Sequence, residues 1–162
     1  MSDTGKPFSL AFNAAVVAMA SRVCPCGYDI EADAEKVPST LAALRAHIEC
    51  MGRIVVWSGA SEDTIFGSGN AEMNWAFRAW HDWTHYAIGA EFNVAGERAV
   101  AMRQIEDLGR VFGERFAAEY APYITEEVIG QAKHYHAKHA FPDNQRQFAR
   151  GYLGAHGVLV SL

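Results

Sequence analysis

The sequence lacks any long hydrophobic run, and this absence excludes a membrane-spanning helix. No stretch approaches the about 18 consecutive apolar residues that such a helix needs. The segment LAFNAAVVAMAS (10–21) resembles the apolar part of a secretory signal. Asp3 precedes it, however, and Asn13 interrupts it, so an amphipathic helix is the expected structure and no membrane partner is expected.

Cysteine is also scarce. The 162 residues contain 3 cysteines, an odd number that does not match the disulfide framework of a small secreted domain. We therefore expect a reducing, cytoplasmic location.

The sequence has no excess of basic residues. Its 14 Lys and Arg against 19 Asp and Glu give a net charge of -5, and no run of one sign is long enough to form an interaction tail. General nucleic-acid binding, which requires a basic surface, is therefore not expected. Walker-type phosphate loops, nucleophile elbows and internal repeats are absent as well. A small-molecule substrate such as a nucleotide is the expected partner.

What the sequence does contain predicts a folded helical protein. Half of its residues are hydrophobic and 12% are aromatic, enough for a core in a chain of this length. We predict one all-α domain over residues 1–162, a compact bundle of five or six helices. The pattern of apolar residues and capping residues places these helices at about 8–22, 40–52, 71–88, 95–118, 126–139 and from 142 onward. Residues 54–67 predict a small β-hairpin or a long ordered loop.

Histidines and carboxylates on three of these helices suggest a metal site. His81 and His85 are four residues apart and share one helix face, which is the spacing of a two-imidazole metal clamp, and Asp82 lies beside them. Glu97 begins the next helix after a short loop, and Glu127 begins a third. The candidate ligands of a divalent ion (Zn, Mn or Fe) are therefore His81, Asp82, His85, Glu97 and Glu127.

These residues also carry the expected catalysis. Asp82, a primary ligand with the two histidines, could also orient a bound water, and Glu97 and Glu127 would supply a further ligand and a general base in an order that the sequence leaves open. Arg78, one turn before Asp82, could stabilise phosphate charge or pair with an acid. Hydrolysis of a nucleotide or other phosphoester through a metal-activated water is the expected reaction.

Other patterns are weaker. Cys24, Cys26, His47 and Cys50 could form a C-x-C…H-x-x-C zinc site, although the C-x-C spacing is tighter than usual and buried free thiols are ordinary. The HYHAKH segment (134–139) looks metal-like, but its first two histidines point apart on a helix and favour a solvated face.

The order of the motifs resembles two known metal patterns. In the HD-domain phosphohydrolases a helix histidine precedes a His-Asp pair and a later aspartate, and here His47 precedes His81-Asp82. This resemblance implies an all-helical metal-dependent phosphohydrolase with His47 as a further ligand, and Glu97 or Glu127 in place of the later aspartate. The zincin motif His-Glu-x-x-His is less similar, because Asp82 replaces its glutamate.

A closer resemblance is to a set of uncharacterised proteins encoded largely by bacteriophages. The family pattern reads F-R-x-x-H-D-x-x-x-H or a near variant, F-x-x-x-G-E-x-x-A, E-x-x-G-Q and F-x-x-x-Q-[RK], and similar motifs lie between residues 74 and 150. Here they are Phe77-Arg78 with His81-Asp82 and His85, Phe92 with Gly96-Glu97 and Ala101, Glu127 with Gly130-Gln131, and Phe141 with Gln145-Arg146. The spacing inside the first and second motifs departs from the family pattern. The resemblance implies a shared site and a host cytoplasmic location, but no particular activity.

Two alternatives to a hydrolase remain. A carboxylate-histidine di-iron site would hold two metals between facing helices, although a paired E-x-x-H motif is missing. A non-enzymatic interaction protein would use the same His/Asp/Glu network only to hold its helices together.

Overall fold

Helices dominate the computed structural model, which describes residues 4–160. The elements in chain order are α1 (Leu10–Val23), η1 (a short 3-10 helix, Ala34–Lys36), α2 (Leu41–Met51), α3 (Ala71–Ile88), α4 (Val94–Phe112), α5 (Glu114–Thr125), η2 (a π-helical turn, Glu126–Gly130), α6 (Gln131–Lys138) and α7 (Gln145–Ala155). Because α5, η2 and α6 are continuous, they count as one long helix. The prediction of an all-α fold is confirmed. None of these helices is long and apolar enough to cross a membrane.

Residues 54–67, expected to form a small β-hairpin or a long ordered loop, contain one short strand followed by a loop, so the small β element is confirmed but the hairpin pairing is not. Strand β2 (Val55–Trp57) pairs with β1 (Asp29–Glu31) in parallel, with Ile30 opposite Val56. Parallel pairing requires a crossover, which η1 and α2 provide. Ile65 and Phe66 gave the second half of the segment a strand-like pattern, but they are fully buried because a loop carries them into the core.

The predicted start of α2 and the predicted end of α3 are confirmed. Thr40 caps α2 through its hydroxyl, which accepts a hydrogen bond from the backbone N–H of Ala43 at 3.1 Å. Gly89 ends α3 with a φ of 68°, a conformation that glycine adopts without strain.

The predicted break between 118 and 126 is wrong, because the helix continues through Pro122. Proline removes one N–H donor, and the carbonyl that loses this partner belongs to Ala118, an exposed residue. Thr125 does not cap a new helix; its hydroxyl instead donates to the carbonyl of Ala121 at 2.7 Å.

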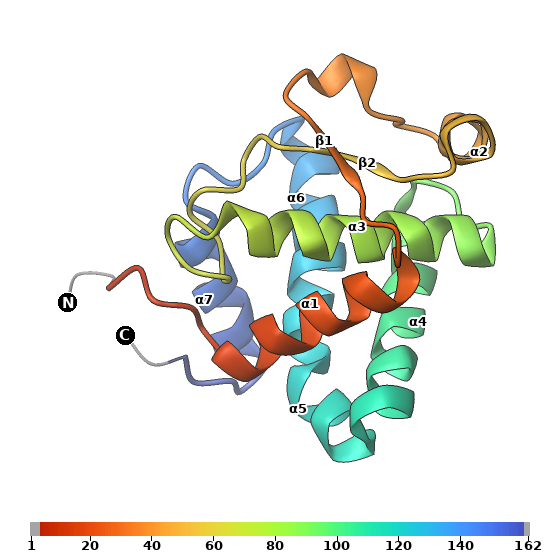
Figure 1. The fold of residues 1–162 in the computed structure, drawn as a ribbon. Helices are drawn as coiled ribbons and strands as arrows, with labels where there is room; N and C mark the ends of the chain where they lie inside the picture. Colours follow the sequence, from red (N-terminus) through yellow and green to blue (C-terminus); the bar gives the residue numbers. More distant parts are fainter. Residues whose placement is uncertain (1–3, 161–162) are drawn as a thin grey trace.

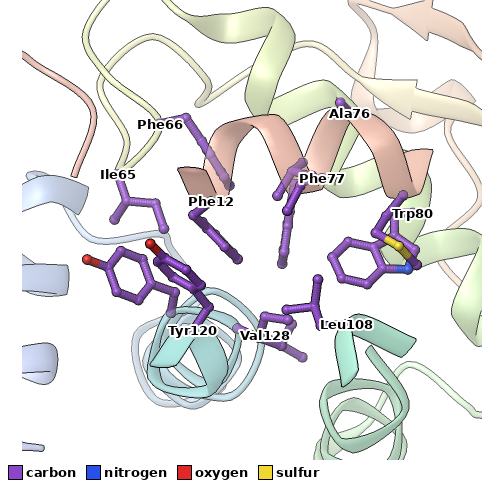
Figure 2. Packing of buried hydrophobic residues seen from close by; sticks show 14 of the residues in the cluster. Phe12, Ile65, Phe66, Ala76, Phe77, Trp80, Leu108, Tyr120 and Val128 are labelled. Carbon is purple, nitrogen blue, oxygen red and sulfur yellow. The ribbon is translucent and has the colours of Figure 1, made fainter. Parts of the chain in front are cut away.

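Helix α3 crosses the middle of the molecule, with the strands and α2 on one side of it and α1 on the other (Figure 1). The main core lies between α1, α3 and the α5–η2 region, and it is rich in aromatic rings (Figure 2). Phe12 stacks on Phe66 and Tyr120, and Phe77 packs between Phe66 and Trp80. Packing in this core fixes the rotation of α3 about its axis. It therefore also fixes which side chains lie on the face of α3 opposite α1.

Arg146 joins three segments that are far apart in the sequence. It lies on α7 and is only 1% exposed. Its Nη1 donates to the carbonyl of Thr64 at 2.6 Å, its Nη2 donates to the carbonyl of Lys6 at 2.8 Å, and its guanidinium lies over the ring of Phe8 at 4.8 Å. The arginine of the Gln145-Arg146 motif is therefore explained by its structural role, which is to hold α7 against the segments that carry Lys6, Phe8 and Thr64.

We predict that Arg146→Met lowers the free energy of unfolding by about 3 kcal/mol, because it leaves the buried carbonyl of Thr64 and the carbonyl of Lys6 without their charged donor. Urea denaturation of the variant and of wild type measures the change. Gln147→Met, on the exposed side of the same helix, is the matched control. Equal stability of the two variants would contradict the anchoring role of Arg146.

Candidate metal centre

The candidate site is built where the end of α3 meets the start of α4. His81 and His85 lie on one face of α3, one turn apart, and Gly89 ends the helix four residues later. A short loop then leads to Asn93, whose side-chain oxygen accepts from the backbone N–H of Gly96 at 2.9 Å and caps α4. Glu97 follows in the first turn of α4, where the positive end of the helix dipole favours a carboxylate.

Three side-chain atoms converge at this point. His81 Nε2 lies 3.1 Å from His85 Nε2 and 3.2 Å from Glu97 Oε2, and His85 Nε2 lies 3.4 Å from the same oxygen. Within residues 4–160 these three residues form the one group of His, Cys, Asp and Glu side chains whose ligand atoms cluster in this way. Two imidazoles and one carboxylate are a common donor set for zinc and for non-haem iron.

The tautomer of His85 is fixed by its surroundings. Its Nδ1 donates to the carbonyl of Ala90 at 2.9 Å, so the neutral ring presents an Nε2 lone pair to His81 and Glu97. The ring is fully buried and stacks on Phe92 at 4.1 Å. A backbone carbonyl on the far nitrogen is the usual partner of a metal-binding histidine.

Gln104 of α4 lies close enough to His81 to act on its pKa. The Nδ1 atom of His81 is buried, and so are both polar atoms of the Gln104 amide, and none of the three has a hydrogen-bond partner among the described residues. Burial alone would lower the pKa of His81, but the hydrogen bond to Glu97, the charge of Glu97 and the Gln104 side chain together raise it. The amide oxygen of Gln104 is therefore the available acceptor for the His81 Nδ1–H.

Gly96 explains how Glu97 reaches the histidines. A Cβ atom on Gly96 would lie only 1.8 Å from the backbone oxygen of Glu91, so only glycine lets the 90–93 loop fold this closely over the start of α4. The same loop carries Ala90 and Phe92 to His85. Burial alone would raise the pKa of Glu97, but hydrogen bonds to His81 and His85 lower it to about 2.

The spacing of the three atoms fits a shared ion. Ligands bound at about 2.0–2.1 Å at tetrahedral angles lie about 3.3–3.4 Å apart. The observed separations are 3.1, 3.2 and 3.4 Å. Without an ion, at most one hydrogen, on His81 Nε2, is available to three electron-rich atoms when both rings are neutral. His81, His85 and Glu97 could therefore hold one divalent metal.

The candidate metal centre borders a cavity of about 590 Å³ that is lined by His81 and Glu97 among others. Glu127 and Arg78 also line this cavity, so the structure brings them near the three converging residues without placing them in that group. Arg78 donates through Nη1 to the carbonyls of Trp57 and Gly59, and burial lowers its pKa. Much of its hydrogen-bonding capacity is thus used to hold the loop after β2.

The π-helical turn η2 delivers Glu127 to the cavity. Glu127 Oε1 accepts a hydrogen bond from Gln131 Nε2 at 3.1 Å. Burial raises the pKa of Glu127 to about 7, although the neighbouring Glu126 and the charges of Arg78 and His81 act in the opposite direction. A cavity carboxyl that titrates near neutral pH is suited to general acid and base catalysis. π-Helical turns are often found at functional sites.

The remaining predicted site residues lie outside the converging group. Asp82 has its pKa raised by burial to about 6, and its charge also acts on the Cys24 thiol. His47 lies on α2, where its Nε2 is buried without a hydrogen-bond partner among the described residues. The cysteines are free: Cys24 is buried, while Cys26 and Cys50 are exposed. In the described chain no zinc-type group forms from these cysteines and His47.

Comparisons of the chain with protein-family profiles, with curated proteins and with solved structures give no match. The resemblances inferred from the sequence motifs are therefore untested, and a function is inferred below from the geometry of the site.

Sequence reasoning missed two residues next to the histidines and one buried acid next to Glu127. The carbonyl of Ala90 had no signal, because any residue could supply it. Gln104 was recognisable only as a polar residue on the apolar face of a helix. Glu126 is fully buried, and burial raises its pKa well above the usual range, with the charge of Glu127 adding to the shift.

We predict that Glu126→Gln stabilises the protein increasingly as the pH rises. Because the pKa of Glu126 is higher in the folded than in the unfolded chain, the folded state binds more protons between the two values, and stability is lost as the pH rises through this interval. The variant removes the loss, so it should exceed wild type by about 1–3 kcal/mol at pH 8 and by much less at pH 4.5. Urea denaturation at both pH values provides the measurement.

Glu119→Gln, a substitution of an exposed carboxylate on α5, controls for the change of net charge. A gain at pH 8 no larger than that of the control would show that Glu126 is not buried as an acid.

Proposed function

We propose that the protein is a metal-dependent hydrolase whose metal is held by His81, His85 and Glu97. The observation that carries the proposal is the convergence of two imidazole nitrogens and one carboxylate oxygen at 3.1–3.4 Å, beside a cavity of substrate size. Zinc is the first candidate because three protein ligands with an open position are the pattern of its catalytic sites. A bound divalent metal would lower the pKa of a water molecule and polarise the bond to be cleaved.

Each residue of the site has a role in this proposal. Ala90 and Gln104 orient the two imidazoles through their outer nitrogens, so that both Nε2 atoms are available as ligands. Glu127 is the general base, because it lines the same cavity and lies close enough for its pKa to respond to His81. Once protonated, Glu127 can return the proton to the leaving group.

The arrangement supports a hydrolase better than a di-iron protein. A di-iron site needs a second set of carboxylate and histidine ligands beside the first. Among the described residues one such group is present. The non-enzymatic alternative accounts for the hydrogen bonds of His85, but it gives no reason for a carboxyl of raised pKa in the adjoining cavity.

We predict that the purified protein binds about one metal ion per chain and that Glu97→Ala and His85→Ala each weaken this binding by more than about 100-fold. Gln104→Leu should weaken it by about 10–100-fold, as expected for a residue that only orients a ligand. Metal content after dialysis and isothermal titration with Zn²⁺, Mn²⁺ and Fe²⁺ measure the affinities.

Circular dichroism verifies that each variant is folded, and His134→Ala, whose ring contacts Phe148 on α7, is the matched histidine control. Absence of stoichiometric metal in the wild-type protein, with all three metals, would refute the metal centre.

We further predict that Glu127→Gln lowers kcat by about 10²–10⁴-fold while metal affinity changes little, because the variant removes the base and keeps the three ligands. The assay uses p-nitrophenyl acyl esters, p-nitroanilides and p-nitrophenyl phosphates with the metal-loaded protein. Glu119→Gln should retain wild-type activity. Metal-loaded protein that hydrolyses none of these substrates, or an E127Q variant with full activity, would contradict the assigned reaction or base respectively.

A further inference from the structure

Aromatic side chains form one part of the cavity wall. Rings from four different parts of the chain line it, namely Trp57 at the end of β2, Phe77 on α3, Phe92 in the loop before α4 and Tyr135 on α6. Phe141 extends this wall: its ring stacks on Trp57 with centroids 6.4 Å apart and packs against Tyr135 at 5.4 Å. Such a surface favours a flat apolar group.

The one permanent cation that lines the cavity is engaged by the protein itself. Of the residues lining it, only Arg78 carries a fixed positive charge. Its Nη1 donates to the carbonyls of Trp57 and Gly59, its Nη2 lies 3.5 Å from the carbonyl of Ala60, and its guanidinium is 5.4 Å from the centre of the Trp57 ring. Moving Arg78 to a ligand would release the loop that forms one wall.

The side-chain amides of the cavity are engaged in the same way. Asn74 donates to the hydroxyl of Ser61 at 3.0 Å, Gln131 to Glu127 at 3.1 Å, and Gln145 to the carbonyl of Ala60 at 3.0 Å. Each of these amide nitrogens already has a protein acceptor.

The charges of the cavity point in the same direction. Glu97 would share its charge with a bound divalent ion, so the charged side chains left over in the cavity are Glu127 and the engaged Arg78. Enzymes that cleave phosphoesters stabilise the phosphoryl oxygens with metal ions together with arginine, lysine or several N–H donors, and here a metal would act without a free arginine or lysine. A carboxylate such as Glu127 would repel a phosphate anion.

We infer that the cavity takes a neutral substrate, an ester or amide next to an aromatic or other flat apolar group, and that it excludes phosphoesters. The inference deepens the proposed hydrolase and rests on it for the bond that is cleaved. The aromatic wall holds the flat group, and the carbonyl lies toward His81 and Glu97. This replaces the phosphoester expected from the sequence with an acyl substrate.

The test compares two ligands that share a phenyl ring and differ in their polar group, acetanilide and phenyl phosphate. Amide chemical shifts of the ¹⁵N-labelled full chain, loaded with zinc, are followed during titration with each ligand at constant pH and ionic strength. We expect acetanilide to shift residues that line the cavity and to bind at least about tenfold more tightly than phenyl phosphate. Phenyl phosphate that binds in the cavity as tightly as acetanilide, or acetanilide shifts that map elsewhere, would overturn the inference.

A variant of the aromatic wall keeps the test specific. Phe141→Ala should weaken acetanilide binding by about three- to tenfold, consistent with an aromatic contact of about 1 kcal/mol. Phe112→Ala, at the exposed end of α4, should leave it unchanged. Equal binding by the two variants would also overturn the inference.

The titration is independent of turnover and is repeated with metal-free protein. Failure of the proposed hydrolase would appear as missing metal or missing catalysis while the order of the two ligands is still measured. Failure of the present inference would appear as a reversed order with metal and catalysis intact.

Discussion

The hydrogen bond between His85 Nδ1 and the carbonyl of Ala90 is the interaction on which the candidate site depends. It is made across the turn that ends α3, so it fixes the path of the chain toward α4 while it selects one tautomer of a fully buried imidazole. The selected tautomer turns a lone pair toward His81 and Glu97. One local contact thereby couples the geometry of the turn to the electronic state of a candidate ligand.

Two other features hold the histidines and Glu97 in this arrangement, namely the packing of α3 and the glycine at position 96. The aromatic core holds α3 through Phe77, one turn before His81, and Trp80, directly before His81, and so sets the direction in which His81 and His85 project. From the other side, Gly96 allows the loop and α4 to approach within a distance that no side chain would permit. The long helix α5–η2–α6 forms another wall of the cavity and carries Glu127.

Local signals in the sequence predicted most of the helices and three converging residues, because helix periodicity and capping act within a few positions. The i, i+4 spacing of His81 and His85 and the first-turn position of Glu97 needed no knowledge of tertiary contacts. The β pairing was not predictable in the same way, since β1 and β2 meet only through a crossover of more than twenty residues. The helix through Pro122 was not predictable for a related reason. A proline inside a helix destabilises it less when the carbonyl that loses its partner is exposed to solvent, and that exposure is a property of the folded chain.

The π-helical turn η2 also has a consequence for the phase of the helix that contains it. Each residue of an α-helix advances by about 100°, so the wider ring of a π-turn shifts every later side chain around the axis relative to the earlier ones. The segment before the turn directs Tyr120, Tyr123 and Ile124 into the core, and the segment after it directs Gln131 and Tyr135 to the cavity. A single helix thus presents one face to the core before the turn and a different face to the cavity after it.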